Sequence, residues 1–256
     1  MPHFSSDGID IAYSDEGAGE PVLLIHGFAS NARVNWQSTG WLATLLGAGF
    51  RAIAMDVRGH GESAKLYDPR LYHPSLLAGD AANLLRHLGI GSAVVIGYSM
   101  GGRIAAFLAA AHPDSVRALI IGGMGLGMVV GIGGEEEIAA ALEADSLDAV
   151  TGERGRGYRK FAELTRSDCR ALAACMRGQR VPVTPEALAS LHLPVLIAVG
   201  TRDTVAGSPE GLAALIAGAE VLSIPNRDHM LATGDKAFKA GVLEFLARRL
   251  APKANS

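Results

Sequence analysis

Residues 93–111 read AVVIGYSMGGRIAAFLAAA, an apolar run followed by a glycine-flanked serine and then by an alanine-rich stretch. The run 93–96 is typical of a strand covered on both faces, and residues 100–111 are typical of a helix. A GxSxG segment between a strand and a helix holds its serine in a strained turn, where glycine two residues to either side avoids the neighbouring backbone. The chain has 32 glycines among 256 residues, so the pentapeptide could arise by chance, and the flanking elements give it weight. Ser99 is therefore a candidate nucleophile.

Short apolar runs recur along the rest of the chain and alternate with helical patterns. Strands are expected at 22–25, 52–55, 93–96, 118–121, 195–199 and, more weakly, 221–224, with a hairpin strand at 9–13 after an Asp7-Gly8 turn. Helices are expected at 36–46, 74–88, 100–111, 209–217 and 235–250. This alternation predicts an α/β fold with a mostly parallel sheet, helices on both faces and a ligand crevice at the carboxyl ends of the strands.

One interval breaks the alternation. Between residues 122 and 186 no strand is expected, only a glycine-rich start, an acidic cluster and short helical pieces. We interpret 122–186 as an inserted helical cap on a core formed by 1–121 and 187–256. The glycines at 122–127 lack the GxGxxG spacing of a dinucleotide site, and the chain has no phosphate-binding loop.

Composition narrows the functional classes. A hydrophobic fraction of 49%, a charged fraction of 19% and a net charge of −3 are typical of a globular protein and predict no nucleic-acid partner. The N-terminal residues show no secretory pattern, and the run 120–134 is too short to span a bilayer, so a cytoplasmic location without a membrane span is expected. Cys169 and Cys175 are interpreted as packing residues, and no metal-ligand pattern is present.

A serine nucleophile needs a histidine base and a carboxylate that orients it. Asp203 follows the strand expected at 195–199, and His229 follows the one expected at 221–224. Both would therefore lie at the same edge of the sheet as Ser99. Asp228 is an alternative carboxylate, although a sequence neighbour is badly placed to reach the imidazole, and Asp56 is a second choice.

The serine in GYSMGG, the aspartate in GTRD and the histidine in RDHM, in that order around parallel strands, resemble the α/β-hydrolase family over essentially the whole chain. The segments HGF at 26–28 and DVRGHGES at 56–63 also resemble that family. The resemblance implies an oxyanion hole from the backbone N–H groups of Phe28 and Met100. His26 and His60, in glycine-flanked turns, are interpreted as structural.

We therefore expect a serine hydrolase that cleaves a carboxylic ester of a small or medium apolar substrate through an acyl-enzyme, without metal or organic cofactor. Hydrolysis of a carbon–carbon bond in a diketone-like acid, thioester hydrolysis and cofactor-free peroxidation remain open, because these chemistries share fold and nucleophile. A non-catalytic receptor that keeps the hydrolase pocket is a further alternative. The arginines and lysine of the expected cap could attract a carboxylate-bearing substrate, although a solvated helix face is the commoner explanation of such charges. The pattern does not indicate an oligomeric state.

Overall fold

The computed structural model describes residues 1–131 and 133–250, so Ile132 of the expected cap and residues 251–256 of the expected core lie outside it. Within these residues eight strands form one sheet in the order β1-β2-β4-β3-β5-β6-β7-β8. β2 is antiparallel to β1 and β4, and all other neighbours are parallel, as predicted. The strands are β1 His3–Ser6, β2 Ile9–Glu16, β3 Pro21–Ile25, β4 Arg51–Met55, β5 Ala93–Tyr98, β6 Val116–Gly122, β7 Val195–Gly200 and β8 Glu220–Ile224.

The N-terminal hairpin is confirmed. Asp7 and Gly8 join β1 to β2 with φ values of 48° and 84°, the positive φ pair that a two-residue hairpin turn requires. β2 continues beyond the hairpin and pairs with β4, so that it extends the main sheet on its antiparallel side.

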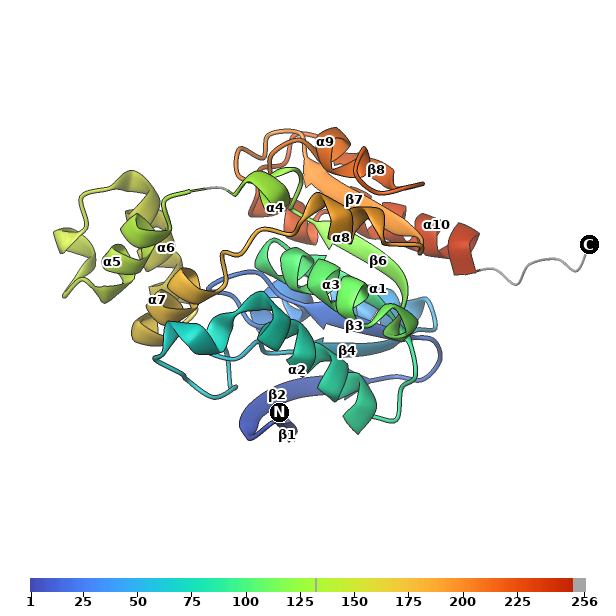
Figure 1. Cartoon of the computed structure of the whole chain (residues 1–256), viewed down its shortest axis with the longest axis horizontal. Coiled ribbons are helices and arrows are strands. Elements are labelled where there is room, and N and C mark those ends of the chain that lie inside the picture. The colour runs from blue at the N-terminus through green and yellow to red at the C-terminus, as the bar shows by residue number, and fades with distance from the viewer. Residues whose placement is uncertain (132, 251–256) are drawn as a thin grey trace, which may run out of the picture.

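Helices cover both faces of the sheet (Figure 1). On one face, α2 (Pro74–His87), α3 (Met100–Ala111) and α9 (Pro209–Ala213) contribute to one continuous hydrophobic cluster. On the other, α1 (Trp41–Gly47) and α10 (Lys236–Leu250) enclose a second cluster around Trp36, Trp41 and Phe238. The central strands are buried on both sides, which explains why their sequences are continuous apolar runs and not alternating patterns.

The helix expected at 36–46 is wrong as a single element. A short π-helical turn, Arg33–Gln37, is followed by a break and then by α1. Gly40 has φ 80°, and the Thr39 hydroxyl donates to the carbonyl oxygen of Asn35 at 2.6 Å. The hydroxyl and the left-handed glycine therefore end the first turn before the second begins.

The helix expected at 209–217 is also shorter than predicted, because α9 ends at Ala213. The amides of Leu215 and Ile216 bond to carbonyls three residues earlier, and Gly218 has φ 73°. These tight turns place the buried Ile216 side chain against the core.

Helices and no strand fill the described residues between β6 and β7. They are α4 (Gly127–Val130), α5 (Glu135–Glu143), a 3₁₀ turn (Leu147–Ala149), α6 (Glu153–Leu164), α7 (Cys169–Gly178) and α8 (Pro185–Ala189). We call α5–α7, residues 135–178, the helical segment. It lies to one side of the sheet (Figure 1) and packs as a unit, α5 against both α6 and α7. The expected boundary at 186/187 falls inside α8, which packs against α3.

None of the helices in the described part of the chain is long and apolar enough to cross a membrane.

Candidate active site

Ser99 lies in a strained turn between β5 and α3. Its backbone has φ 54° and ψ −113°, and its amide donates to the carbonyl oxygen of Gly122 on β6 at 2.8 Å. A Cβ added to Gly97 would overlap the Gly101 backbone, and one added to Gly101 would overlap the Ile25 carbonyl. The two flanking glycines are therefore required by close backbone approach, as the sequence pattern predicts.

His229 bridges Ser99 and Asp203. Its Nε2 lies 3.0 Å from the Ser99 Oγ, and its Nδ1 lies 2.8 Å from the Asp203 Oδ2. Asp203 follows β7 and His229 follows β8, so three loops at the carboxyl edge of the sheet supply the three side chains. If Nδ1 carries the proton, Nε2 is free to accept one from the serine hydroxyl.

The Asp203 carboxylate is fully enclosed, with an exposed fraction of 0% for its side chain. Burial alone would raise its pKa, but the hydrogen bond and charge of His229 and the amides of Val205 and Ala206 outweigh this, so the pKa is lowered. A carboxylate that stays ionised beside the imidazole can stabilise the imidazolium form.

The competing carboxylates have other partners. Asp228 is a loop cap: its Oδ1 accepts hydrogen bonds from the amides of Met230 and Leu231. Asp56 joins two loops, because its oxygens accept from the amides of Ala32 and Glu62. Neither takes the position that Asp203 has beside His229.

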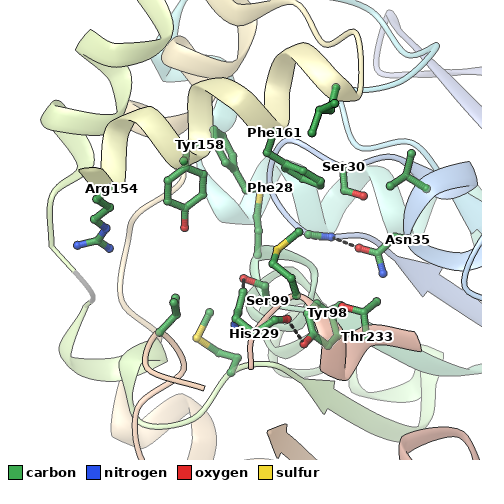
Figure 2. A pocket seen from close by; sticks show the side chains of 18 of the residues that line it. Phe28, Ser30, Asn35, Tyr98, Ser99, Arg154, Tyr158, Phe161, His229 and Thr233 are labelled. Atoms are coloured by element: carbon green, nitrogen blue, oxygen red, sulfur yellow. Dashed lines mark hydrogen bonds between the residues drawn. The ribbon is translucent and has the colours of Figure 1, made fainter. Parts of the chain in front are cut away.

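Tyr98 is a contributor that the sequence reading overlooked. Its hydroxyl donates to the backbone carbonyl of His229 at 2.6 Å (Figure 2). Burial raises the pKa of this phenol, which keeps it a proton donor at neutral pH. The residue before the nucleophile thus holds the loop that carries the histidine.

The HGF loop, residues 26–28, lies against the turn at Ser99 between β5 and α3, which we call the elbow. The Gly27 amide donates to Asn35 Oδ1 at 3.0 Å, and Ala29 has φ 58°. Across residues 1–131 and 133–250, the amides of Phe28 and Met100 have no hydrogen-bond acceptor. Both are therefore available as donors to a ligand beside Ser99.

His26 and His60 have structural environments. His26 Nε2 accepts from the Val57 amide at 3.0 Å, and its Nδ1 donates to the Gly27 carbonyl at 2.7 Å. Burial lowers the pKa of both rings, for His60 to about 3, so both are neutral at physiological pH. These contacts tie the HGF loop to the loop after β4.

A cavity of about 530 Å³ separates Ser99 and His229 from the helical segment. Ser99, His229, Phe28 and Met124 form part of its lining on the sheet side. Tyr158 and Phe161 project from α6 on the opposite side (Figure 2). Met128, which is close in sequence to Met124, is buried outside this lining.

The charges of the expected cap divide into two sets. Arg177 pairs with Glu136 and Glu143, and Arg159 with Glu163, as a solvated helix face would. Arg154, Lys160 and Arg180, by contrast, line the cavity together with Glu153 and with Arg103 of α3, which the sequence reading did not single out.

Within the part of the chain that the structure describes, no group of three or more His, Cys, Asp or Glu side chains is arranged to hold a metal ion. Cys169 and Cys175 are both free thiols on α7.

Known proteins resemble this chain in sequence and in fold. Residues 20–180 match the family model described as alpha/beta hydrolase fold. An epoxide hydrolase of Caballeronia sordidicola is 36% identical over 115 residues, 45% of this chain and 34% of that protein. A 2-(acetamidomethylene)succinate hydrolase of Mesorhizobium japonicum is 31% identical over 192 residues, 73% of this chain and 60% of that protein. The chain thus spans only part of the length of these relatives.

Solved structures extend the similarity to the whole fold. A hydrolase from Pseudomonas aeruginosa has a TM-score of 0.80 at 25% identity, covering 96% of this chain and 97% of that one. An esterase from Exiguobacterium antarcticum has a TM-score of 0.76 at 22% identity, covering 94% and 96%, a likeness of fold alone.

Proposed function

The chain belongs to the alpha/beta hydrolase fold family, and on this basis we propose that it is a serine hydrolase that cleaves carboxylic esters through an acyl-enzyme on Ser99. One observation carries the proposal: the His229 imidazole lies between the Ser99 hydroxyl and the Asp203 carboxylate at 3.0 and 2.8 Å. His229 Nε2 takes the serine proton as Oγ attacks the ester carbonyl, and it then returns the proton to the leaving alcohol. In the second half of the reaction, water attacks the acyl carbonyl as His229 takes its proton, and the proton then returns to the Ser99 Oγ as the acid leaves.

The oxyanion hole in this proposal consists of the Phe28 and Met100 amides. Their lack of an acceptor in the described residues supports this role, as does the position of Met100 directly after the nucleophile, at the start of α3. Loss of one such donor typically costs about a hundredfold to a thousandfold in rate. Apart from the ester and water, the reaction as written uses only groups of this chain.

We assign the cap role to the segment expected at 122–186, over the core expected at 1–121 and 187–256, with Gly122 kept in β6 and α8 kept whole with the core. The cavity between the sheet edge and α6 supports this division, and its aromatic lining from Phe28, Tyr158 and Phe161 suits a small or medium apolar group. Among the contacts that join the two regions, the Thr165 hydroxyl donates to the Ala29 carbonyl at 2.9 Å, and the rings of Phe28 and Tyr158 meet edge to face.

The test is the covalent intermediate itself. The protein is mixed with p-nitrophenyl butyrate, quenched within seconds and digested, and the peptide masses are read. We expect a butyryl mass increase on the peptide that contains Ser99 and none in the Ser99→Ala variant. Turnover without any acylated peptide, or turnover that Ser99→Ala retains, would exclude the mechanism.

Two further assays on the native protein distinguish ester hydrolysis from the alternative functions. Rapid labelling of Ser99 by a fluorophosphonate excludes the idle receptor, because only an activated serine reacts. Parallel assays with an ester, a thioester and a vinylogous diketone acid identify the bond that is cleaved, and the highest kcat/KM should belong to the ester.

A further inference from the structure

Arg103 is a buried cation without a counter-ion at hydrogen-bonding distance. Its exposed fraction is 2%, and it is the only charged residue of α3. Among the residues that the structure describes, its Nε and Nη2 have no hydrogen-bond partner. Its Nη1 has one long contact, 3.4 Å to the carbonyl oxygen of Val181.

Such an arrangement is costly. Burial and the nearby charge of Arg180 lower the pKa of Arg103 to about 10, while Glu135 opposes them. The guanidinium therefore remains charged at neutral pH, and a buried charge without a partner strongly destabilises the folded state. A cation one turn from a helix N-terminus also opposes the helix dipole. No structural contact described above compensates for this cost.

The position of Arg103 relates it to the nucleophile. Ser99 and Arg103 are four residues apart at the start of α3, which places them on one face of the helix about 6 Å apart along its axis. Both line the cavity, and so does Arg180, whose pKa burial also lowers. An anion at this end of the cavity would contact two guanidinium groups. A single small substrate could therefore place one group there and its ester carbonyl beside the Ser99 Oγ.

We propose that Arg103, with Arg180 beside it, binds a carboxylate of the substrate, so that the preferred esters carry a free carboxylate in addition to the ester group. The planar guanidinium can bind a carboxylate through two parallel N–H···O bonds. The inference rests on the proposed esterase function and narrows its substrate class.

Paired substrates test the preference. On the acyl side, p-nitrophenyl hemiglutarate is compared with p-nitrophenyl hexanoate; on the alcohol side, 4-acetoxybenzoate is compared with phenyl acetate. We expect the native protein to favour the anionic member of at least one pair about tenfold or more in kcat/KM. Arg103→Met should lower that ratio at least about thirtyfold, because a buried charged partner is lost, and Arg103→Lys should retain part of it.

Stability separates a binding role from a structural one. Methionine fills a similar volume without charge, so Arg103→Met should melt at the same temperature as the native protein or higher. Arg86→Met, the same substitution on an exposed arginine of α2, is the control and should leave the substrate ratio unchanged. A lower melting temperature for Arg103→Met together with an unchanged ratio would make Arg103 structural and overturn the proposal.

Binding of glutarate keeps this test independent of catalysis. Glutarate should raise the melting temperature of the native protein and of Ser99→Ala, but not that of Arg103→Met. If neutral esters acylate Ser99 while neither the anionic pairs nor glutarate depends on Arg103, the carboxylate site is wrong and the esterase assignment stands. If glutarate binds through Arg103 but no ester acylates Ser99, the esterase assignment is wrong and the carboxylate site stands.

Discussion

The elbow at Ser99 and the helical segment that faces it across the cavity are held in place by different forces. At the elbow, backbone contacts backbone: Gly97 and Gly101 allow close approach, and the Ser99 amide bonds to the Gly122 carbonyl. The helical segment relies on side chains, including the Arg177 ion pairs between α5 and α7. Geometry fixed by the backbone tolerates little change in sequence, whereas side-chain contacts can be replaced one at a time. The proposed chemistry therefore lies at the elbow, and residues of the helical segment can change substrate selection without disturbing it.

The largest expected difference between the two regions is in turnover. His229→Ala should lower kcat for p-nitrophenyl butyrate about 10⁴-fold or more, because the serine loses its base. Tyr158→Ala, on the opposite wall, should change kcat/KM by about tenfold at most. Steady-state kinetics with melting temperatures as the folding control measures both. Similar losses from the two variants would remove the distinction between the regions.

Glycine-to-alanine substitutions should have opposite signs in the two regions. Gly101→Ala should destabilise the protein by about 3 kcal/mol, since its Cβ would overlap the Ile25 carbonyl. In α6, Gly157 is exposed and has no atom near the position of a Cβ, so Gly157→Ala should stabilise by about 0.5–1 kcal/mol through helix propensity. Urea unfolding measures both free energies. A stabilised Gly101→Ala would show that the elbow tolerates a side chain.

Between pH 8 and pH 5, acid should weaken the region beneath the elbow through the buried His60, whereas the helical segment contains no histidine that titrates in this range. Burial, and then the adjacent His26, hold the pKa of His60 at about 3. The unfolded chain takes up this proton near pH 6.5, so stability is full above that pH and declines as the pH falls toward 3. One such group costs about 2 kcal/mol between pH 8 and pH 5.

The His60→Asn variant tests this dependence. Its stability should fall less steeply than that of the native protein between pH 8 and pH 5, whatever its stability at pH 8, when urea midpoints are compared at each pH. Parallel curves for the two proteins would assign the acid sensitivity to other groups.

The smallest effect should come from an ion pair of the helical segment. Arg177→Met removes the contacts with Glu136 and Glu143, which lie near the surface and are screened by salt. We expect at most about fivefold faster proteolysis within residues 135–178 and little change in kcat. The difference should shrink in 0.5 M NaCl. Loss of activity comparable to that of His229→Ala would mean that the segment shapes the triad directly.

The same contrast explains what could be predicted from the sequence. The central strands were readable because burial on both faces leaves continuous apolar runs. Ser99 and Asp203 were readable because each follows such a run, and His229 because it follows the weaker strand pattern at 221–224; topology then brings all three to one edge. The break at Thr39 and Gly40 was not, since helical periodicity continues through it and a side-chain hydrogen bond decides the outcome.

Contacts between distant residues were beyond the sequence pattern. The Tyr98 hydroxyl meets the His229 carbonyl 131 residues away, and nothing in the local sequence marks that pair. Arg103 did leave a trace: a single charge in an otherwise apolar helix, four residues after the nucleophile. The sequence does not show that this cation lines a cavity; only the folded structure does.

The order of the strands has one more consequence. His229 follows β8, the strand at one edge of the sheet, whose first four residues are alternately half-buried and exposed, whereas Ser99 follows β5 in the middle of the sheet. On heating, local unfolding begins at the edge of a sheet, so His229 would separate from Ser99 before the central strands unfold. Between those two temperatures the proposed activity would be lost while the centre of the sheet stays folded, and cooling would restore it.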